Sequence, residues 1–152
     1  MQDKLIILEE YKLLNETFFH AKMSVDFRNE PNMNYRHHFH AGNFADVMKH
    51  VLLLQILTRL NAKDKPYRYV DTHGGAGKYD LSLAPAQKSG EFLNGIHRLV
   101  KLDDSIKRQA PEGVQQYLKL VEAMRETDGQ GAYPGSPWFA LQGMRDIDKA
   151  TI

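Results

Sequence analysis

Residues 67–78 read Y-R-Y-V-D-T-H-G-G-A-G-K, and this stretch decides the expected fold. Its first part, Tyr67 to Val70, is rich in β-branched and aromatic residues and ends at Asp71, which predicts a short buried strand. A glycine-rich turn follows at 74–77, where main chain without Cβ atoms allows a ligand to approach closely. Ligands of open α/β sheets bind outside the carboxyl ends of strands. The stretch therefore predicts an α/β protein with a nucleotide-like ligand at this turn.

Two sharper nucleotide motifs do not fit the same stretch. A P-loop, G-x-x-x-x-G-K-[ST], would need glycine at Thr72 and a hydroxyl ligand for Mg²⁺ at Tyr79. A dinucleotide fingerprint, G-x-G-x-x-G, would need a third glycine at Asp80. These departures argue against an NTPase and against NAD binding, and they leave a tight turn without any ligand as the plainer alternative.

The composition indicates one soluble domain. Its 152 residues are 42% hydrophobic and 26% charged, and a formal net charge of +1 restricts any nucleic-acid contact to a local patch. The absence of cysteine excludes disulfides and thiolate metal sites and is typical of a cytoplasmic protein. No apolar run reaches the roughly 18 residues of a membrane span, and the amino terminus lacks the features of a secretory signal. We therefore expect a cytoplasmic protein without a membrane partner.

Residues 33–50 contain four of the seven histidines of the chain. The close spacing of His37, His38 and His40 could hold zinc on a strand, but no H-E-x-x-H pattern supports a metal site. The same segment offers cationic and aromatic side chains that suit phosphates and unpaired bases. We therefore favour an RNA-facing surface over a metal site.

Periodic apolar residues predict several helices. An amphipathic helix is expected over 3–22 and is followed by a polar linker. Asn43 is expected to cap an apolar helix over 44–60. Two further helices are expected over 91–101 and 114–125, with apolar faces formed by Phe92, Ile96 and Leu99 and by Tyr117, Leu118, Val121 and Met124. A short helix over 138–144 is expected to be capped by Ser136 and to have Pro137 at its first position.

Three stretches together resemble one family. They are Y-R-H-x-F-H-A-G-N-x-A-D-V-x-K-H at 35–50, K-P-Y-x-Y-x-D-T-H-x-G-A-G-x-Y at 65–79 and Y-P-G-S-P at 133–137, with K-S-G-E-F-L-x-G-I at 88–96 between them. They look like the RlmJ-type methyltransferases of bacteria. These enzymes use S-adenosylmethionine to methylate N6 of an adenine in 23S ribosomal RNA.

The resemblance implies a partial Rossmann-like fold with a small helical insertion at about 84–130, in a chain rich in helices. It implies that residues 1–32 are an extension, a helix plus a linker, and that 33–152 form the amino-terminal part of the methyltransferase domain. It also implies site residues. Those expected to contact S-adenosylmethionine are Lys49, His50, Asp71, His73, Gly74, Gly75, Gly77 and Ser136. Those expected to face RNA are Tyr35, Arg36, His37 and His38.

The family pattern continues beyond Ile152, where its Asp-Pro-Pro-Tyr motif is expected. An adenine amine must be held through both N–H groups during methyl transfer, and no Asp/Asn-Pro-Pro-aromatic run occurs in the 152 residues. We therefore expect no catalytic residue within the chain and no activity from the chain alone. A separate carboxy-terminal half, or self-association through apolar surface, is an expected partner. The alternative is a catalytically inactive RNA-binding or interaction module.

Overall fold

The computed structural model describes residues 37–152. The helix expected over 3–22 and the RNA contacts expected at Tyr35 and Arg36 lie outside this range. The elements in chain order, with η for a 3-10 helix, are η1 (His37–Phe39), α2 (Phe44–Asn61), β1 (Arg68–Val70), β2 (Lys78–Asp80), α3 (Ala84–Ser89), η2 (Glu91–Asn94), α4 (Ile96–Val100), α5 (Asp104–Gln109), α6 (Glu112–Asp128), β3 (Ala132–Pro134), α7 (Ser136–Gly143) and β4 (Lys149–Thr151).

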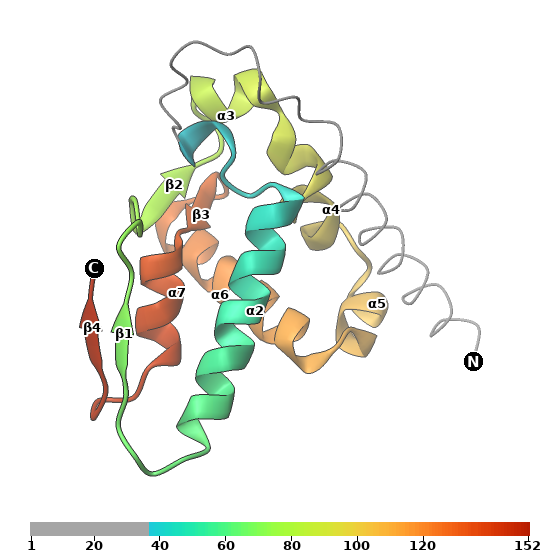
Figure 1. Cartoon of the computed structure of the whole chain (residues 1–152). Helices are drawn as coiled ribbons and strands as arrows, with labels where there is room; N and C mark the ends of the chain where they lie inside the picture. The colour runs from blue at the N-terminus through green and yellow to red at the C-terminus, as the bar shows by residue number, and fades with distance from the viewer. Residues whose placement is uncertain (1–36) are drawn as a thin grey trace, which may run out of the picture.

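Helix α2 is the central element (Figure 1), packed against α6 and α7. It begins as expected, because the Asn43 side chain accepts a hydrogen bond from the main-chain N–H of Asp46 at 2.8 Å. Leu54 and Leu57 are buried on its inner face, whereas Leu52 and Ile56 are exposed. The helix predicted over 44–60 is confirmed, and its inner face carries two buried polar residues, Asp46 and His50.

The strands form two separate pairs. Strand β1 runs parallel to β4, with Tyr69 opposite Ala150, and β2 runs antiparallel to β3, with Tyr79 opposite Tyr133. The strand predicted over 67–70 is confirmed, but its expected burial is wrong, since Val70 is 57% exposed. Within the described residues β1 pairs with β4 alone, so one edge of β1 lies without a strand beside it. The fold is helix-rich with few strands.

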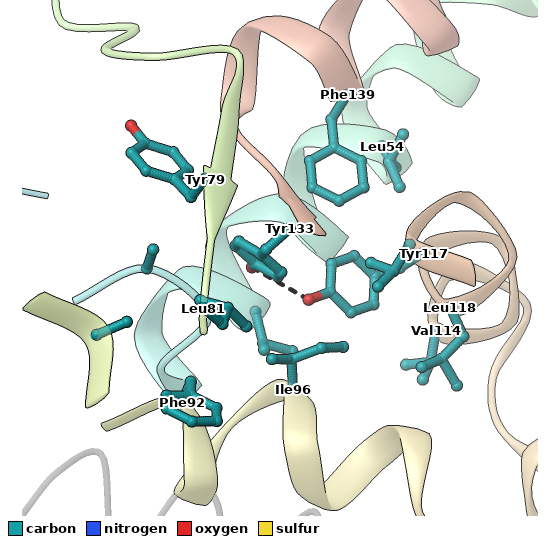
Figure 2. Packing of buried hydrophobic residues seen from close by; sticks show 14 residues of the cluster. Leu54, Tyr79, Leu81, Phe92, Ile96, Val114, Tyr117, Leu118, Tyr133 and Phe139 are labelled. Atoms are coloured by element: carbon teal, nitrogen blue, oxygen red, sulfur yellow. Dashed lines mark hydrogen bonds between the residues drawn. The ribbon is translucent and has the colours of Figure 1, made fainter. Parts of the chain in front are cut away.

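The core lies where α2, α6, β3 and α7 meet. Figure 2 shows Tyr117 and Tyr133 with their hydroxyls directed toward each other beside Phe139, and all three side chains are fully buried. The hydroxyl oxygens are 3.1 Å apart, so each buried polar atom has a partner. The apolar face predicted for 114–125 is confirmed, because its four members are all buried in α6. Helix α6 is longer than predicted, spanning Glu112–Asp128.

The single helix predicted over 91–101 is wrong. The segment divides at Gly95 into η2 and α4, although Phe92 and Ile96 are buried as expected. A Cβ atom at Gly95 would lie 2.1 Å from the carbonyl oxygen of Gly42, and the N–H of Ile96 donates to that oxygen at 2.9 Å. Contact between two segments of main chain thus prevents a continuous helix at this position.

The capping role predicted for Ser136 is also wrong. Helix α7 begins at Ser136 itself, and Gly135 is the cap residue, without a side-chain hydrogen bond. The Ser136 hydroxyl instead donates to the carboxylate of Asp71 at 3.0 Å. The amino end of α7 is thereby fastened to the loop that follows β1.

Arg145 fastens the other end of β1. Its guanidinium donates to Asp148 at 2.9 Å and to the main-chain carbonyl of Asn61 at 3.2 Å. Asp148 in turn accepts the N–H of Tyr67 at 3.0 Å. These bonds hold together the end of α2, the start of β1 and the segment before β4. They thereby fix the position of β1 and of the loop that follows Val70.

Candidate functional site

The loop over 71–77, called here the glycine loop, is organised by Asp71. One carboxylate oxygen accepts the N–H of His73 at 3.0 Å, and the other accepts the hydroxyls of Tyr69 at 2.8 Å and Ser136 at 3.0 Å. Partial burial acts to raise the pKa of Asp71, but these hydrogen bonds and the charge of Lys49 outweigh it and lower the pKa. Asp71 is therefore an anchored carboxylate at the end of β1.

The three glycines of the loop have different surroundings. Gly75 has φ of +63°, and a Cβ atom there would lie 2.7 Å from the Tyr79 hydroxyl. A Cβ atom at Gly74 would lie 2.9 Å from side-chain atoms of both Pro137 and Ile152. At Gly77 a Cβ atom would meet nothing within 4 Å. Packing within the chain accounts for the first two glycines, whereas Gly77 leaves open space beside the main chain.

Tyr79 joins the glycine loop to the histidine segment. Its hydroxyl accepts the N–H of Ala76 at 3.2 Å. The rings of His37 and His38 lie edge-on to the Tyr79 ring, with centroid distances of 5.0 and 5.2 Å. The two histidines predicted to face RNA are therefore neighbours of the loop predicted to hold the cofactor.

A groove of about 480 Å³ opens beside these histidines. It is lined by His38, β2, Ser82, Leu83 and the turn between α6 and β3. Lys78, the lysine of this groove, lies 3.4 Å from Asp128 across it. The charge of Lys78 is thus partly offset, and the groove offers mixed polar contacts instead of a strongly cationic surface.

A second group of polar residues, called here the buried carboxylate cluster, consists of Asp46 with His37, Lys49 and His50. Oδ2 of Asp46 accepts from the N–H of Gly42 at 3.1 Å and lies 3.2 Å from Nε2 of His37. Oδ1 lies 2.6 Å from Nζ of Lys49 and 3.6 Å from Nε2 of His50. Every contact of this carboxylate is with a group that can donate a hydrogen bond.

Burial and neighbouring charges shift the pKa values of Asp46 and His50, the two buried members of the cluster. Burial acts to raise the pKa of Asp46, but the hydrogen bond from His37 and the nearby positive charges outweigh it, so the pKa is well below its usual range. Burial lowers the pKa of His50 to about 4, against the attraction of Asp46. At neutral pH the pair is an ionised carboxylate beside a neutral imidazole.

Lys49 connects the cluster with the glycine loop. Half of its side chain is exposed, and its charge acts on both Asp46 and Asp71. The structure therefore brings Lys49, Asp71, His73, Ser136 and the glycines to one region. His50 is placed differently, because its ring is fully buried between Tyr133 and Phe139, with centroid distances of 5.9 and 4.6 Å.

Sequence reasoning missed Asp46, Tyr69, Tyr79 and Tyr133 as members of this region. Asp46 stands one helical turn before His50, and this spacing is a signal that places both on one face of a helix. Tyr69 precedes Asp71 by two residues, so both share one face of an extended strand. Tyr79 and Tyr133 had no comparable signal, since they reach the site only through the β2–β3 pairing.

Among residues 37–152 no group of three or more histidine, cysteine or acidic side chains is placed to hold a metal ion. Nor does any helix in this range have the length and apolar character needed to cross a membrane.

Comparison with known families identifies the chain. The family model described as ribosomal RNA large subunit methyltransferase D, RlmJ, matches residues 64–152, which include β1, the glycine loop and Ser136. The chain belongs to the RlmJ family. The resemblance stated from the sequence motifs is thereby confirmed.

Two curated RlmJ relatives extend the match toward the amino terminus. Ribosomal RNA large subunit methyltransferase J of Escherichia coli is 41% identical over 120 residues, which cover 79% of this chain and 41% of the relative. The Haemophilus influenzae protein of the same name is 39% identical over 121 residues, with the same coverage. The chain thus spans about two fifths of the length of these relatives.

A solved structure shares the fold of the RlmJ-family chain. The crystal structure of protein LPL1258 from Legionella pneumophila matches with a TM-score of 0.62 and 35% sequence identity. The match covers 73% of this chain and 39% of the Legionella chain. Three relatives therefore agree on the share of a longer protein to which this chain corresponds.

Proposed function

We propose that this chain serves in S-adenosylmethionine-dependent methylation of an adenine N6 in 23S ribosomal RNA, in the cytoplasm. The proposal includes a Rossmann-like domain over 33–152 with a helical insertion at about 84–130, and an amino-terminal extension over 1–32. Family membership and the names of the relatives support the reaction class. The single observation that carries the cofactor assignment is the open space at Gly77, in the same loop as the anchored Asp71.

The residues around the glycine loop fit the proposed cofactor. Bare main chain at Gly77 allows close approach, and the Asp71 carboxylate is held ionised where it can accept hydrogen bonds from an amine or hydroxyl. Ser136 donates to Asp71 of the same loop, the charge of Lys49 acts on that carboxylate, and His73 is exposed on the loop. We assign binding of S-adenosylmethionine to these residues, to Gly74 and Gly75 as shapers of the loop, and to His50 behind them.

When bound, S-adenosylmethionine supplies an electrophilic methyl group on a sulfonium. In the overall reaction the bond from sulfur to methyl breaks, the N6–methyl bond forms, and the amine loses one proton. The residues of this chain would position the donor. We assign no residue of the chain to holding the adenine amine, which is consistent with the expectation that the chain alone is inactive.

For the RNA we propose the histidine segment as the contact surface. His38 is exposed beside a groove, and His37 shares the Tyr79 ring with it. Tyr35 and Arg36 immediately precede them in the sequence. Exposed Leu52, Ile56 and Val70 offer apolar surface for the proposed carboxy-terminal half or for self-association.

The test is incubation of the chain with labelled S-adenosylmethionine and large-subunit RNA that lacks the modification. The reaction is run with the chain alone and with a separately produced protein that corresponds to the remaining part of the Escherichia coli relative. Transfer of label to adenine N6 in the mixture only is expected. Transfer by the chain alone would refute the expectation of inactivity. RNA binding without cofactor binding in either sample would instead support the inactive RNA-binding alternative.

A further inference from the structure

We propose that Asp46 is a positioning residue, whose buried carboxylate sets the tautomer of His50 and holds Lys49 beside the glycine loop. The inference rests on the proposed function, because Lys49 and His50 matter there as cofactor-side residues. Asp46 itself faces no ligand, since its side chain is 2% exposed.

The carboxylate of Asp46 is surrounded by hydrogen-bond donors. An ionised carboxylate only accepts hydrogen bonds, and the low pKa of Asp46 keeps it ionised. Oδ2 accepts from Gly42 and is within hydrogen-bonding distance of Nε2 of His37. Oδ1 faces Lys49 and Nε2 of His50. Gly42, His37 and Lys49 present protons to Asp46 within hydrogen-bonding distance, and the negative charge of Oδ1, 3.6 Å away, favours a proton on Nε2 of His50.

The hydroxyls of Tyr117 and Tyr133 and the ring of His50 form a buried hydrogen-bond chain, and its direction depends on the tautomer of His50. If Nε2 of His50 carries its proton toward Asp46, then Nδ1 of the neutral ring is an acceptor. Tyr133 lies 3.1 Å from that Nδ1 and 3.1 Å from the Tyr117 hydroxyl. Tyr133 then donates to His50 and accepts from Tyr117. The order of donation is Tyr117 to Tyr133 to His50, and the Nε2 proton of His50 points toward Asp46 from 3.6 Å, beyond hydrogen-bonding distance.

Asparagine at position 46 would keep the shape of the side chain but not its charge. An asparagine at position 46 would have to present its NH₂ group to donors on one side or the other, whichever way its amide turned. Facing His50, this group would favour a ring that accepts at Nε2 and carries its proton on Nδ1. It would also repel Lys49, which loses the carboxylate 2.6 Å from its Nζ. Asp46→Asn therefore removes the negative charge that favours a proton on Nε2 of His50 and that holds Lys49.

The experiment uses nitrogen-15 spectra of the histidine ring in the whole chain at pH 7, with S-adenosylmethionine titrated afterwards. Wild type should show His50 protonated on Nε2, and Asp46→Asn should show a larger share of His50 protonated on Nδ1. Asp104→Asn is the matched control, since it removes one exposed carboxylate from α5. Affinity for S-adenosylmethionine should fall at least about tenfold in Asp46→Asn alone, the loss expected for one charge-assisted contact.

Tyr133→Phe keeps the experiment informative if Asp46→Asn does not fold. It removes the donor at Nδ1 and leaves Asp46 intact, so His50 should stay protonated on Nε2. A His50 protonated on Nδ1 in wild type, or in Tyr133→Phe, would overturn the inference. Unchanged His50 and unchanged affinity in a folded Asp46→Asn chain would also overturn it. A wild-type chain with the expected tautomer but without S-adenosylmethionine binding would instead reject the proposed function.

Discussion

The buried carboxylate cluster and the glycine loop lie beside each other, but only the cluster is enclosed by the chain itself. In the cluster, Asp46 and His50 are almost completely buried, and each oxygen of the carboxylate faces donors from the same chain. In the loop, Asp71 is anchored, yet His73 is exposed and the space beside Gly77 is open. A buried polar group must find its partners within the fold, whereas an open main chain can accept them from a ligand. The difference separates Asp46, which organises the site, from residues of the loop that would contact a ligand.

The largest loss of stability should come from adding a side chain at Gly95, where the main chain packs against Gly42 beside the cluster. Gly95→Ala would place a Cβ atom 2.1 Å from the carbonyl oxygen of Gly42, beside the N–H that Asp46 binds. Because main chain cannot move aside cheaply, we expect a loss of more than about 4 kcal/mol in the free energy of unfolding. Urea denaturation would measure it. Gly77→Ala is the control from the open region and should change stability by less than about 0.5 kcal/mol. Similar losses in both variants would contradict the contrast between the regions.

Acid should weaken the cluster before the loop. The folded chain keeps His50 neutral down to pH about 4, whereas an unfolded chain takes up a proton near pH 6.5. Stability due to neutral His50 is therefore lost as the pH falls from 6.5 to 4, by about 3 kcal/mol in total. Asp46 adds a loss in the same direction below pH 3.8, its ordinary pKa. His50→Gln should flatten the dependence above pH 4 in denaturation experiments, and an equal slope in both chains would contradict the account.

Removing one hydroxyl from the buried chain should have a moderate effect. Tyr133→Phe deletes the group that lies 3.1 Å from both Tyr117 and His50 and leaves two buried polar atoms without it. We expect destabilisation of about 1–3 kcal/mol. Tyr67→Phe is the control, because its hydroxyl bonds Asn61 in a partly exposed position, and it should cost less than about 1 kcal/mol. Calorimetric melting of both variants would compare them, and equal costs would contradict the special role of the buried chain.

The smallest effect on stability is expected at the edge of the glycine loop. Ser136→Ala removes one of the three hydrogen bonds to Asp71 and should cost at most about 1 kcal/mol. Its effect on S-adenosylmethionine affinity should be a few-fold loss, because Asp71 is then less firmly oriented. Ser82→Ala removes a similar serine–carboxylate bond, to Asp80, away from the loop. Calorimetric titration should show weaker binding for Ser136→Ala only. Equal S-adenosylmethionine affinities of Ser136→Ala and wild type would show that the hydrogen bond from Ser136 to Asp71 does not contribute to cofactor binding.

Much of the fold could be predicted from local patterns. The helix over 44–60 and the apolar face of α6 follow from periodicity, and the strand before Asp71 follows from composition and its flanking residues. The division at Gly95 could not be predicted, because it results from contact with main chain about fifty residues away. Ser136 was assigned to a cap on local grounds, whereas its partner, Asp71, is 65 residues distant. Long-range contacts, invisible to periodicity, account for both errors.

The site shows the same division. The position of the glycine loop could be predicted because its residues, Asp71 to Gly77, are consecutive in the sequence. The role of Asp46 could not, since Gly42, His37 and Lys49 converge on its carboxylate only after folding. Gly75 illustrates a finer limit. Sequence marks it as a ligand-side glycine, yet its positive φ and the nearby Tyr79 hydroxyl already require glycine there.

The assignment of the glycine loop as the cofactor site is tested most directly by a nuclear magnetic resonance titration of the chain with S-adenosylmethionine. This method also detects weak binding. Gly77→Val is the decisive variant, because its side chain would enter space that is open in the chain itself and would leave the fold intact. Ala123→Val adds similar bulk at an exposed position of α6 as the control. Wild type and the control should show shifts concentrated at 71–77, Lys49 and Ser136, and Gly77→Val should show none. Binding by Gly77→Val as tight as by wild type, or shifts confined to other regions, would contradict the assignment of the glycine loop as the cofactor site.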